Sequence, residues 1–168
     1  MPGLHNTFGI AVRNFTAYPE MPDARALVEY GVKMEQMGFD SLWVWDHILL
    51  GVEPSFPIVD SLTLLTAIAA RTSKIKLATG ILVLPLRNPV VLAKQLASMD
   101  QLSDGRLLLA MASGWYRREF DAVGVPFEQV QDNTGFRLER GSPETAERPS
   151  ARELEFLRRL DPDRLYTA

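Results

Sequence analysis

Cysteine is absent from the whole chain of 168 residues. Its absence excludes disulfide bonds and thiolate ligands for a metal, and it is compatible with a cytoplasmic protein. The amino-terminal stretch MPGLHNTFGIAV lacks the basic start and the long apolar region of a secretory signal peptide, and no apolar run approaches the length that spans a membrane. We therefore expect a cytoplasmic protein that has no membrane partner.

An excess of basic residues is also lacking. The chain carries 18 Lys and Arg residues against 21 Asp and Glu residues, which gives a formal net charge of -3 and a pI near 5.4. Without a broad basic surface, nucleic acid is not an expected partner. The motifs GxGxxG, GxxxxGK[ST], HExxH and GxSxG are missing too, so nucleotide binding by a Rossmann fold, zinc chemistry and serine hydrolysis have no support. We expect no metal.

Strand-like and helix-like patterns alternate in the first part of the chain. Short runs rich in apolar and aromatic residues are typical of strands, whereas apolar residues that recur about every 3.6 positions are typical of helices. The predicted elements are a strand at 8–12, a helix at 24–37 after Asp23, a strand at 41–45, and a helix from Asp60 or Ser61 to near Arg71.

The run from Ile75 to Trp115 is the most informative part of the sequence. Lys76 to Val83 predicts a strand buried on both faces, and Asn88 followed by Pro89 predicts a helix N-cap and first helical position. Ser103-Asp104-Gly105 ends that helix, and Arg106 to Met111 predicts the next strand. A helical crossover of this size joins parallel strands, so the fold class is α/β with a parallel sheet.

Three segments resemble a known family: GFDSLWVWDH, TGILVLPLRNPVVLAKQLASMDQLSDGRLLLAMASGW and RREFDAVGVPFE. The sequence resembles the luciferase-like flavin or deazaflavin-dependent oxidoreductases, which are (β/α)8 TIM barrels, from about Phe8 to Glu128. A complete barrel takes roughly 250 residues. The resemblance therefore implies that residues 1–128 are the N-terminal half of such a barrel, about its first four βα units.

The tail from 129 to 168 has lost this rhythm. It contains no lysine, seven arginines and eight acidic residues, and its stretch GSPETAERPS is typical of linkers. We expect a divergent, irregular and poorly ordered tail, whose one candidate element is a short helix at 152–160. A truncated or frame-shifted gene product and a genuine lineage-specific tail both remain open.

Asp46 and His47 follow the second predicted strand, at the end where barrel enzymes assemble their sites. Taken alone, the pair favours a turn residue beside a surface histidine, because two adjacent side chains point to opposite faces of a strand. The resemblance implies instead that both lie against the cofactor ring. His47 would then be a catalytic acid, base or charge stabiliser.

Thr79-Gly80-Ile81 is predicted to contact the cofactor, again through the resemblance. In the family, this part of the third strand often carries a non-proline cis peptide bond that forms a backstop behind the ring, and we place it between Gly80 and Ile81. The alternative is a plain strand that contains a glycine.

Ser113-Gly114-Trp115 follows the fourth predicted strand and resembles the loop at the cofactor's edge. Gly114 would let the backbone approach the cofactor, while Trp115 and Trp45 would line the substrate pocket. Packing of both indoles is the alternative. Arg87 is open to two interpretations, a contact with an anionic cofactor tail or a solvated loop residue.

The activity that the resemblance implies is hydride transfer with a deazaflavin, coenzyme F420, or FMN-dependent monooxygenation of a small organic substrate. The pattern LPLRNPVVLAKQ most resembles the deazaflavin branch, so coenzyme F420 is preferred over FMN. The alternative is a non-catalytic half-barrel that self-associates as a homo-oligomer or pairs with a separately encoded half, because half a site is expected to bind a cofactor poorly.

Overall fold

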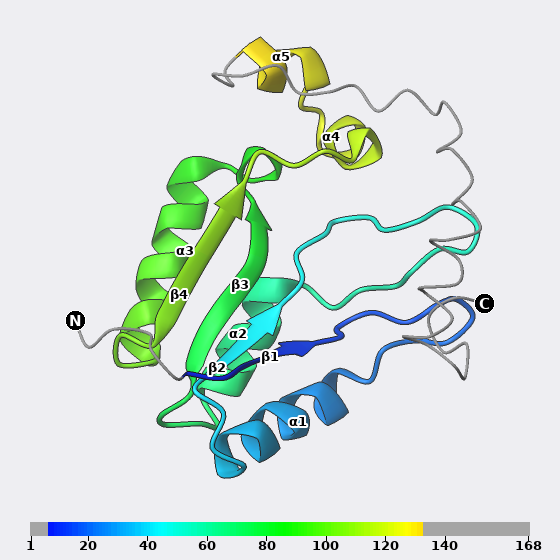
Figure 1. The fold of residues 1–168 in the computed structure, drawn as a ribbon. Coiled ribbons are helices and arrows are strands. Elements are labelled where there is room, and N and C mark those ends of the chain that lie inside the picture. The colour runs from blue at the N-terminus through cyan, green and yellow to red at the C-terminus, as the bar shows by residue number, and fades with distance from the viewer. Residues whose placement is uncertain (1–6, 133–168) are drawn as a thin grey trace, which may run out of the picture. The chain divides into compact units, whose positions relative to one another are not determined.

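The computed structural model describes residues 7–132. Helices and strands alternate along the chain, as Figure 1 shows. The elements are β1 (Gly9–Val12), α1 (Ala24–Gln36), β2 (Ser41–Val44), α2 (Ser61–Ala69), β3 (Lys76–Val83), the 3-10 turn η1 (Leu84–Leu86), α3 (Pro89–Leu102), β4 (Leu107–Ala112), α4 (Arg117–Val123) and α5 (Phe127–Asp132).

The four described strands form one parallel sheet in the order β1-β2-β3-β4. The register places Gly9 beside Ser41, Ser41 beside Lys76, and Leu77 beside Leu107. Because all four strands run the same way, the loops that follow them gather at one edge of the sheet (Figure 1). The α/β class and the parallel sheet predicted from the sequence are confirmed.

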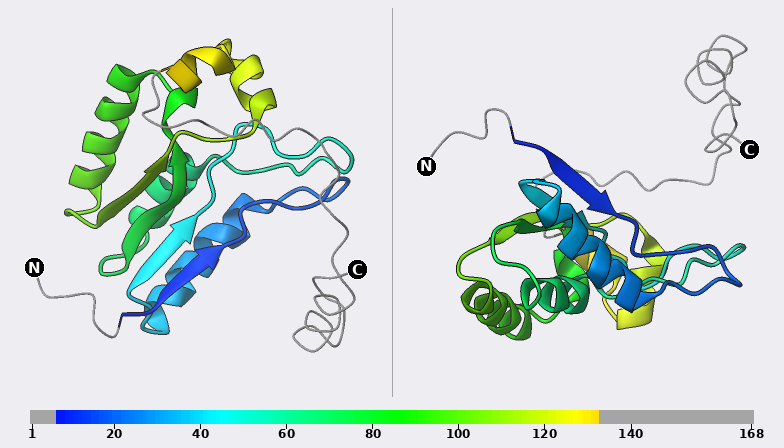
Figure 2. Two further views of the ribbon diagram at one scale, coloured as in Figure 1. Left: turned by 45° about the horizontal axis from the view of Figure 1, so that its top comes forward. Right: turned by 90° about the horizontal axis from the view of Figure 1, so that it is seen from below.

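The helices α1, α2 and α3 cover one face of the sheet, and Figure 2 shows this layering from two further directions. Alternate strand residues such as Leu42, Val44, Leu77 and Leu82 point into this layer and are fully buried. The members of the core are Val12, Met34, Leu42, Val44, Leu62, Leu64, Leu65, Ile68, Ala69, Ile75, Leu77, Leu82, Leu92 and Met99.

Local capping explains where the helices begin. The carboxylate of Asp23 accepts hydrogen bonds from the N–H groups of Arg25 and Ala26, and Asn88 does the same for the first turn of α3. Pro89 follows as the first residue of α3, where its missing N–H costs nothing. These predicted helix starts are confirmed because capping depends on residues close in sequence.

An irregularity interrupts the pairing of β3 with β4 between Thr79 and Leu82. The peptide bond between Gly80 and Ile81 is cis at this point, as the family resemblance predicted. The hydroxyl of Thr79 donates to the carbonyl of Ala110 at 2.9 Å and accepts from the N–H of the same residue at 3.2 Å. This side chain therefore links the two strands where their regular register changes.

Three short elements were not predicted: η1, α4 and α5. The short helices α4 and α5 follow Trp115, in a region where the sequence has no long apolar period. Helix α5 continues to Asp132, past the boundary that the sequence suggested at Glu128. The helix predicted at 152–160 lies outside the described residues.

Among residues 7–132, no helix is both long and apolar enough to cross a membrane.

Candidate active site

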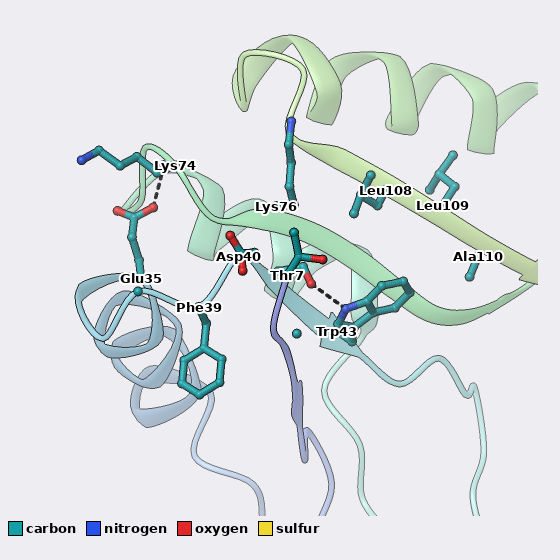
Figure 3. Close-up of a pocket in the computed structure, with 13 residues that line it drawn as sticks. Thr7, Glu35, Phe39, Asp40, Trp43, Lys74, Lys76, Leu108, Leu109 and Ala110 are labelled. Carbon is teal, nitrogen blue, oxygen red and sulfur yellow. Dashed lines mark hydrogen bonds between the residues drawn. The ribbon is translucent and has the colours of Figure 1, made fainter. Parts of the chain in front are cut away.

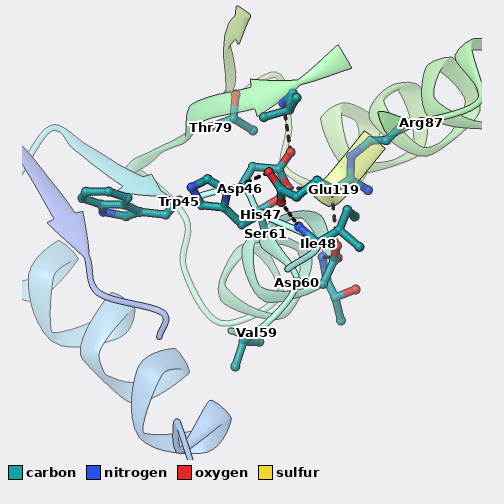
Figure 4. Close-up of polar contacts among 12 residues, drawn as sticks. Trp45, Asp46, His47, Ile48, Val59, Asp60, Ser61, Thr79, Arg87 and Glu119 are labelled. Atoms are coloured by element: carbon teal, nitrogen blue, oxygen red, sulfur yellow. Dashed lines mark hydrogen bonds and ion pairs between the residues drawn. The ribbon is translucent and has the colours of Figure 1, made fainter. Parts of the chain in front are cut away.

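The residues that the sequence singled out meet at the carboxyl edge of the sheet. Asp46 and His47 follow β2, Gly80-Ile81 lies in the last half of β3, and Ser113-Gly114-Trp115 follows β4. Parallel strands bring these segments to the same end although they are far apart in sequence. Figure 4 shows the polar contacts of this region.

Asp46 is 3% exposed, and its carboxylate has three donors in the protein. Oδ1 accepts from the hydroxyl of Ser61 and from Nη2 of Arg87, both at 2.6 Å, and Oδ2 accepts from the N–H of Val83 at 3.0 Å. These bonds join the end of β2 to the end of β3 and to the start of α2. The structure thus shows a tie between elements at Asp46, while its predicted contact with a cofactor stays a prediction.

Arg87 pairs with two carboxylates, Asp46 at 2.6 Å and Asp60 at 3.4 Å. Burial of the guanidinium disfavours its charge, but the two carboxylates outweigh burial and raise the pKa of Arg87. Burial also acts against the charge of Asp60, yet the N–H and hydroxyl of Thr63 together with Arg87 lower the pKa of Asp60. Arg87 is therefore engaged within the protein and is not a solvated loop residue, while its contact with an anionic cofactor tail stays a prediction.

His47 contacts Glu119, a residue that no sequence pattern had indicated, and not its neighbour Asp46. Its Nδ1 lies 3.1 Å from Oε2 of Glu119, which is on α4 and is 1% exposed (Figure 4). Nε2 of His47 has no hydrogen-bond partner within residues 7–132, and 14% of the side chain is exposed. The ring nitrogen that remains open is thus available to a molecule at the carboxyl edge.

Glu119 also holds the chain that follows His47. Its Oε1 accepts from the N–H of Ile48 at 2.6 Å and from the N–H of Leu49 at 3.2 Å. The neighbouring Arg118 donates to the carbonyl of Gly51 at 3.4 Å. Helix α4 and the loop after β2 are therefore fastened to each other beside the histidine.

Gly114 makes this position of α4 sterically feasible. Its φ is +80°, and a Cβ at this residue would lie 2.5 Å from Cγ1 of Val83 and 3.0 Å from Cζ of Phe120. Only glycine accepts both the left-handed backbone and the close contact at little cost. The structure shows Gly114 packed between β3 and α4, and its predicted contact with a cofactor stays a prediction.

Large apolar side chains are exposed at the carboxyl edge. Ile81 at the cis peptide bond is 48% exposed, Trp45 is 43% exposed and Trp115 is 74% exposed. Ser113, two positions before Trp115 in the sequence, is half-buried. The edge therefore presents exposed apolar side chains in addition to the partly exposed imidazole of His47.

The loops after β1 and β2 pair with each other beyond the strand ends (Figures 1 and 2). The N–H of Thr16 donates to Pro57 at 3.2 Å, and that of Tyr18 donates to Ser55 at 2.9 Å. The Phe15 ring packs edge-on against Trp45, with 5.4 Å between the ring centroids. Trp45 thus has a packing role on one side, as the sequence allowed, and an exposed surface on the other.

A cavity of about 840 Å³ lies elsewhere, towards the amino ends of the strands (Figure 3). It is lined by the first residues of β2 and β3, Ser41 and Lys76, and by Trp43, whose indole N–H donates to Ser41 at 2.9 Å. None of the predicted site residues lines it. This cavity is therefore distinct from the carboxyl-edge site.

The family model for luciferase-like monooxygenases matches residues 7–134. An F420-dependent glucose-6-phosphate dehydrogenase of Amycolatopsis mediterranei is 38% identical over 119 residues, which are 70% of this chain and 36% of the relative. An FMNH2-dependent dimethylsulfone monooxygenase of Pseudomonas fluorescens is 35% identical over 101 residues, 58% of this chain and 27% of the relative. The chain thus spans only about a third of the length of these relatives.

The solved structure of the monooxygenase RslO1 from Streptomyces bottropensis superimposes with a TM-score of 0.61 at 27% identity. The match covers 75% of this chain and 39% of RslO1. Together with the parallel order β1-β2-β3-β4, it shows the fold that the sequence predicted, a partial TIM barrel of about four βα units.

Proposed function

The chain belongs to the luciferase-like monooxygenase family, and on that basis we propose that it is an oxidoreductase that binds a flavin-type ring at the carboxyl edge of its sheet. His47 supports this proposal most directly. It is a partly exposed imidazole with an open Nε2, held by a buried glutamate beside exposed apolar side chains. Such a group can accept or donate a proton near neutral pH.

The residues at this edge fit a flavin or deazaflavin ring. A flat aromatic ring buries apolar surface, and Ile81 and Trp45 offer it. We propose that the backbone at Gly80-Ile81 and the loop at Ser113-Gly114 hold the ring, and that Trp115 adds a wall of the substrate pocket. Asp46 supports the site by fixing the ends of β2 and β3.

A bound deazaflavin supplies hydride transfer, whereas a reduced flavin can also supply oxygen chemistry. The protein's own part is to orient the substrate and to hold or move a proton at Nε2 of His47. Coenzyme F420 is our preferred cofactor, because the match to the F420-dependent relative is longer than the match to the FMNH2-dependent one, 119 against 101 residues. The substrate is a small organic molecule in either case.

A fluorescence titration of the full chain with coenzyme F420 and with FMN tests the proposal, with the mass of the species measured by light scattering. We expect saturable binding and tighter binding of coenzyme F420. His47→Ala is expected to lower turnover by roughly 10²-fold or more while leaving binding within a few-fold, as for loss of an acid-base group. Turnover that does not change in His47→Ala would show that another residue carries the proton.

A second candidate function is a non-catalytic half-barrel that pairs with another chain or with a second copy. Within residues 7–132, β1 and β4 each pair with one strand only, and Leu109 and Met111 of β4 are exposed. Such edges favour pairing with another strand. Tight cofactor binding by a monomer would contradict this candidate, and absence of binding in every oligomeric form would contradict the enzyme.

A further inference from the structure

We infer that Glu119 is a positioning residue that keeps the imidazole proton of His47 on Nδ1 and leaves Nε2 as the acceptor. The use of Nε2 in a reaction rests on the proposed function, but the location of the proton does not. Glu119 is on α4 and His47 follows β2, 72 positions earlier in the chain.

The two oxygens of Glu119 have different partners. Oε1 accepts from the backbone N–H groups of Ile48 and Leu49 at 2.6 and 3.2 Å, and Oε2 lies 3.1 Å from Nδ1 of His47. Backbone N–H groups are obligatory donors, so Oε1 must act as an acceptor. An ionised carboxylate has only acceptors, and Oε2 therefore requires the proton on Nδ1.

No other carboxylate is bonded to the imidazole within the described part of the chain. Asp46 is adjacent in sequence, but its oxygens face Ser61, Val83 and Arg87. The hydrogen bonds of Glu119 therefore determine which nitrogen of the His47 imidazole carries the proton. In a neutral imidazole, the hydrogen bond made by one nitrogen determines the state of the other.

Substitution by glutamine inverts this arrangement for a geometric reason. In Glu119→Gln, the two N–H groups of Ile48 and Leu49 still require an oxygen, so the amide oxygen takes the place of Oε1. The amide NH2 then faces Nδ1 and can only donate to it. Nδ1 must be unprotonated, and the proton moves to Nε2.

Nitrogen-15 NMR of the full chain with labelled histidine, without any cofactor, measures the tautomer directly. The chain contains two histidines, so His5 serves as the internal reference. We expect neutral His47 to carry its proton on Nδ1 in the unsubstituted protein. In Glu119→Gln, we expect the ratio of the two tautomers to change by at least roughly tenfold in favour of Nε2–H, which corresponds to about 1.4 kcal/mol.

Glu35→Gln is the matched control. Glu35 of α1 also accepts hydrogen bonds from backbone N–H groups, those of Ser73, Lys74 and Ile75. These three residues form the loop before β3, at the opposite end of the strand from the site. This variant is expected to leave the tautomers of both histidines unchanged.

Two results would overturn the inference: a proton on Nε2 of His47 in the unsubstituted chain, or an unchanged tautomer ratio in folded Glu119→Gln. The first needs no variant, so a folding defect of Glu119→Gln does not remove the test. Cofactor titration of the same samples separates the two claims. A protein with Nδ1–H that binds neither coenzyme F420 nor FMN would contradict the proposed function and support the positioning role.

Discussion

Replacing Asp46 by asparagine tests whether this residue ties elements of the fold together. The variant removes the charge that faces Nη2 of Arg87 at 2.6 Å and puts an NH2 group against one of the present donors, the hydroxyl of Ser61 or the N–H of Val83. Breaking a buried ion pair on one side costs about 3–5 kcal/mol. Asp60, at 3.4 Å, remains as a partner of Arg87 and offsets part of the loss.

We therefore expect Asp46→Asn to lower the free energy of unfolding by about 3 kcal/mol. For a chain of this size, such a loss corresponds to a fall in Tm of roughly 10 °C. Urea denaturation followed by far-UV circular dichroism measures the change, with the m-value expected to stay constant. The double variant with Arg87→Met should lose less than the sum of the two single variants, because the residues act as a pair.

Glu29→Gln is the control for the loss of a carboxylate. Glu29 pairs with Arg71 at 2.8 Å, but both side chains are largely exposed, so we expect a loss below about 1 kcal/mol. A stability of Asp46→Asn within about 0.5 kcal/mol of the unsubstituted chain would refute the tie, since surface substitutions fall in that range. If such a variant had also lost cofactor binding, Asp46 would act on the cofactor, as the sequence resemblance implied.

Gly114→Ala should lower the free energy of unfolding by about 2–4 kcal/mol, because its Cβ would lie 2.5 Å from Val83 at a φ of +80°. Gly124→Ala, at φ +71° but with nothing within 4 Å, should cost only about 1–2 kcal/mol, and equal losses in thermal unfolding would rule out the packing explanation. Burial opposes the charge of Asp60, but Thr63 and Arg87 lower its pKa below the ordinary value of 3.8. Ionised Asp60 should therefore stabilise the fold at pH values above 3.8, and this stabilisation should be lost as the pH falls through the lower pKa of the folded state. Asp60→Asn retains an N-capping side chain, so its stability deficit in urea unfolding should be present at neutral pH and shrink at acidic pH, whereas a deficit independent of pH would contradict this origin.

Local features of the fold could be predicted because they depend on neighbouring residues. Asp23 and Asn88 cap helices a few residues away, and the apolar run Lys76–Val83 coincides with β3. The cis peptide bond at Gly80-Ile81 came from the family resemblance and not from the residues themselves. Nothing in a sequence pattern alone distinguishes it from an ordinary strand glycine.

The partners of the site residues could not be predicted in the same way. The family resemblance implied that Asp46 and His47 both lie against a cofactor ring, but it did not indicate that Asp46 bonds to Arg87 or that His47 contacts Glu119. The second contact joins residues 72 positions apart, so it depends on the packing of α4. The only signal for Glu119 was its place in the segment RREFDAVGVPFE, where the family resemblance gave it no role.

We propose that a flavin-type ring lies against the exposed side chain of Ile81 at the cis peptide bond, beside His47. The most direct test is a fluorescence titration in which coenzyme F420 is added to the unsubstituted chain, to Ile81→Asp and to Leu102→Asp. Both variants replace an exposed apolar residue by aspartate, but Ile81 lies at the carboxyl edge, whereas Leu102 lies at the end of α3 and serves as the control. We predict that Ile81→Asp weakens binding roughly tenfold or more, since a charge against an apolar ring is costly, and that Leu102→Asp binds like the unsubstituted chain. Equal affinities for all three proteins, or no binding of coenzyme F420 or FMN by any of them, would contradict the claim.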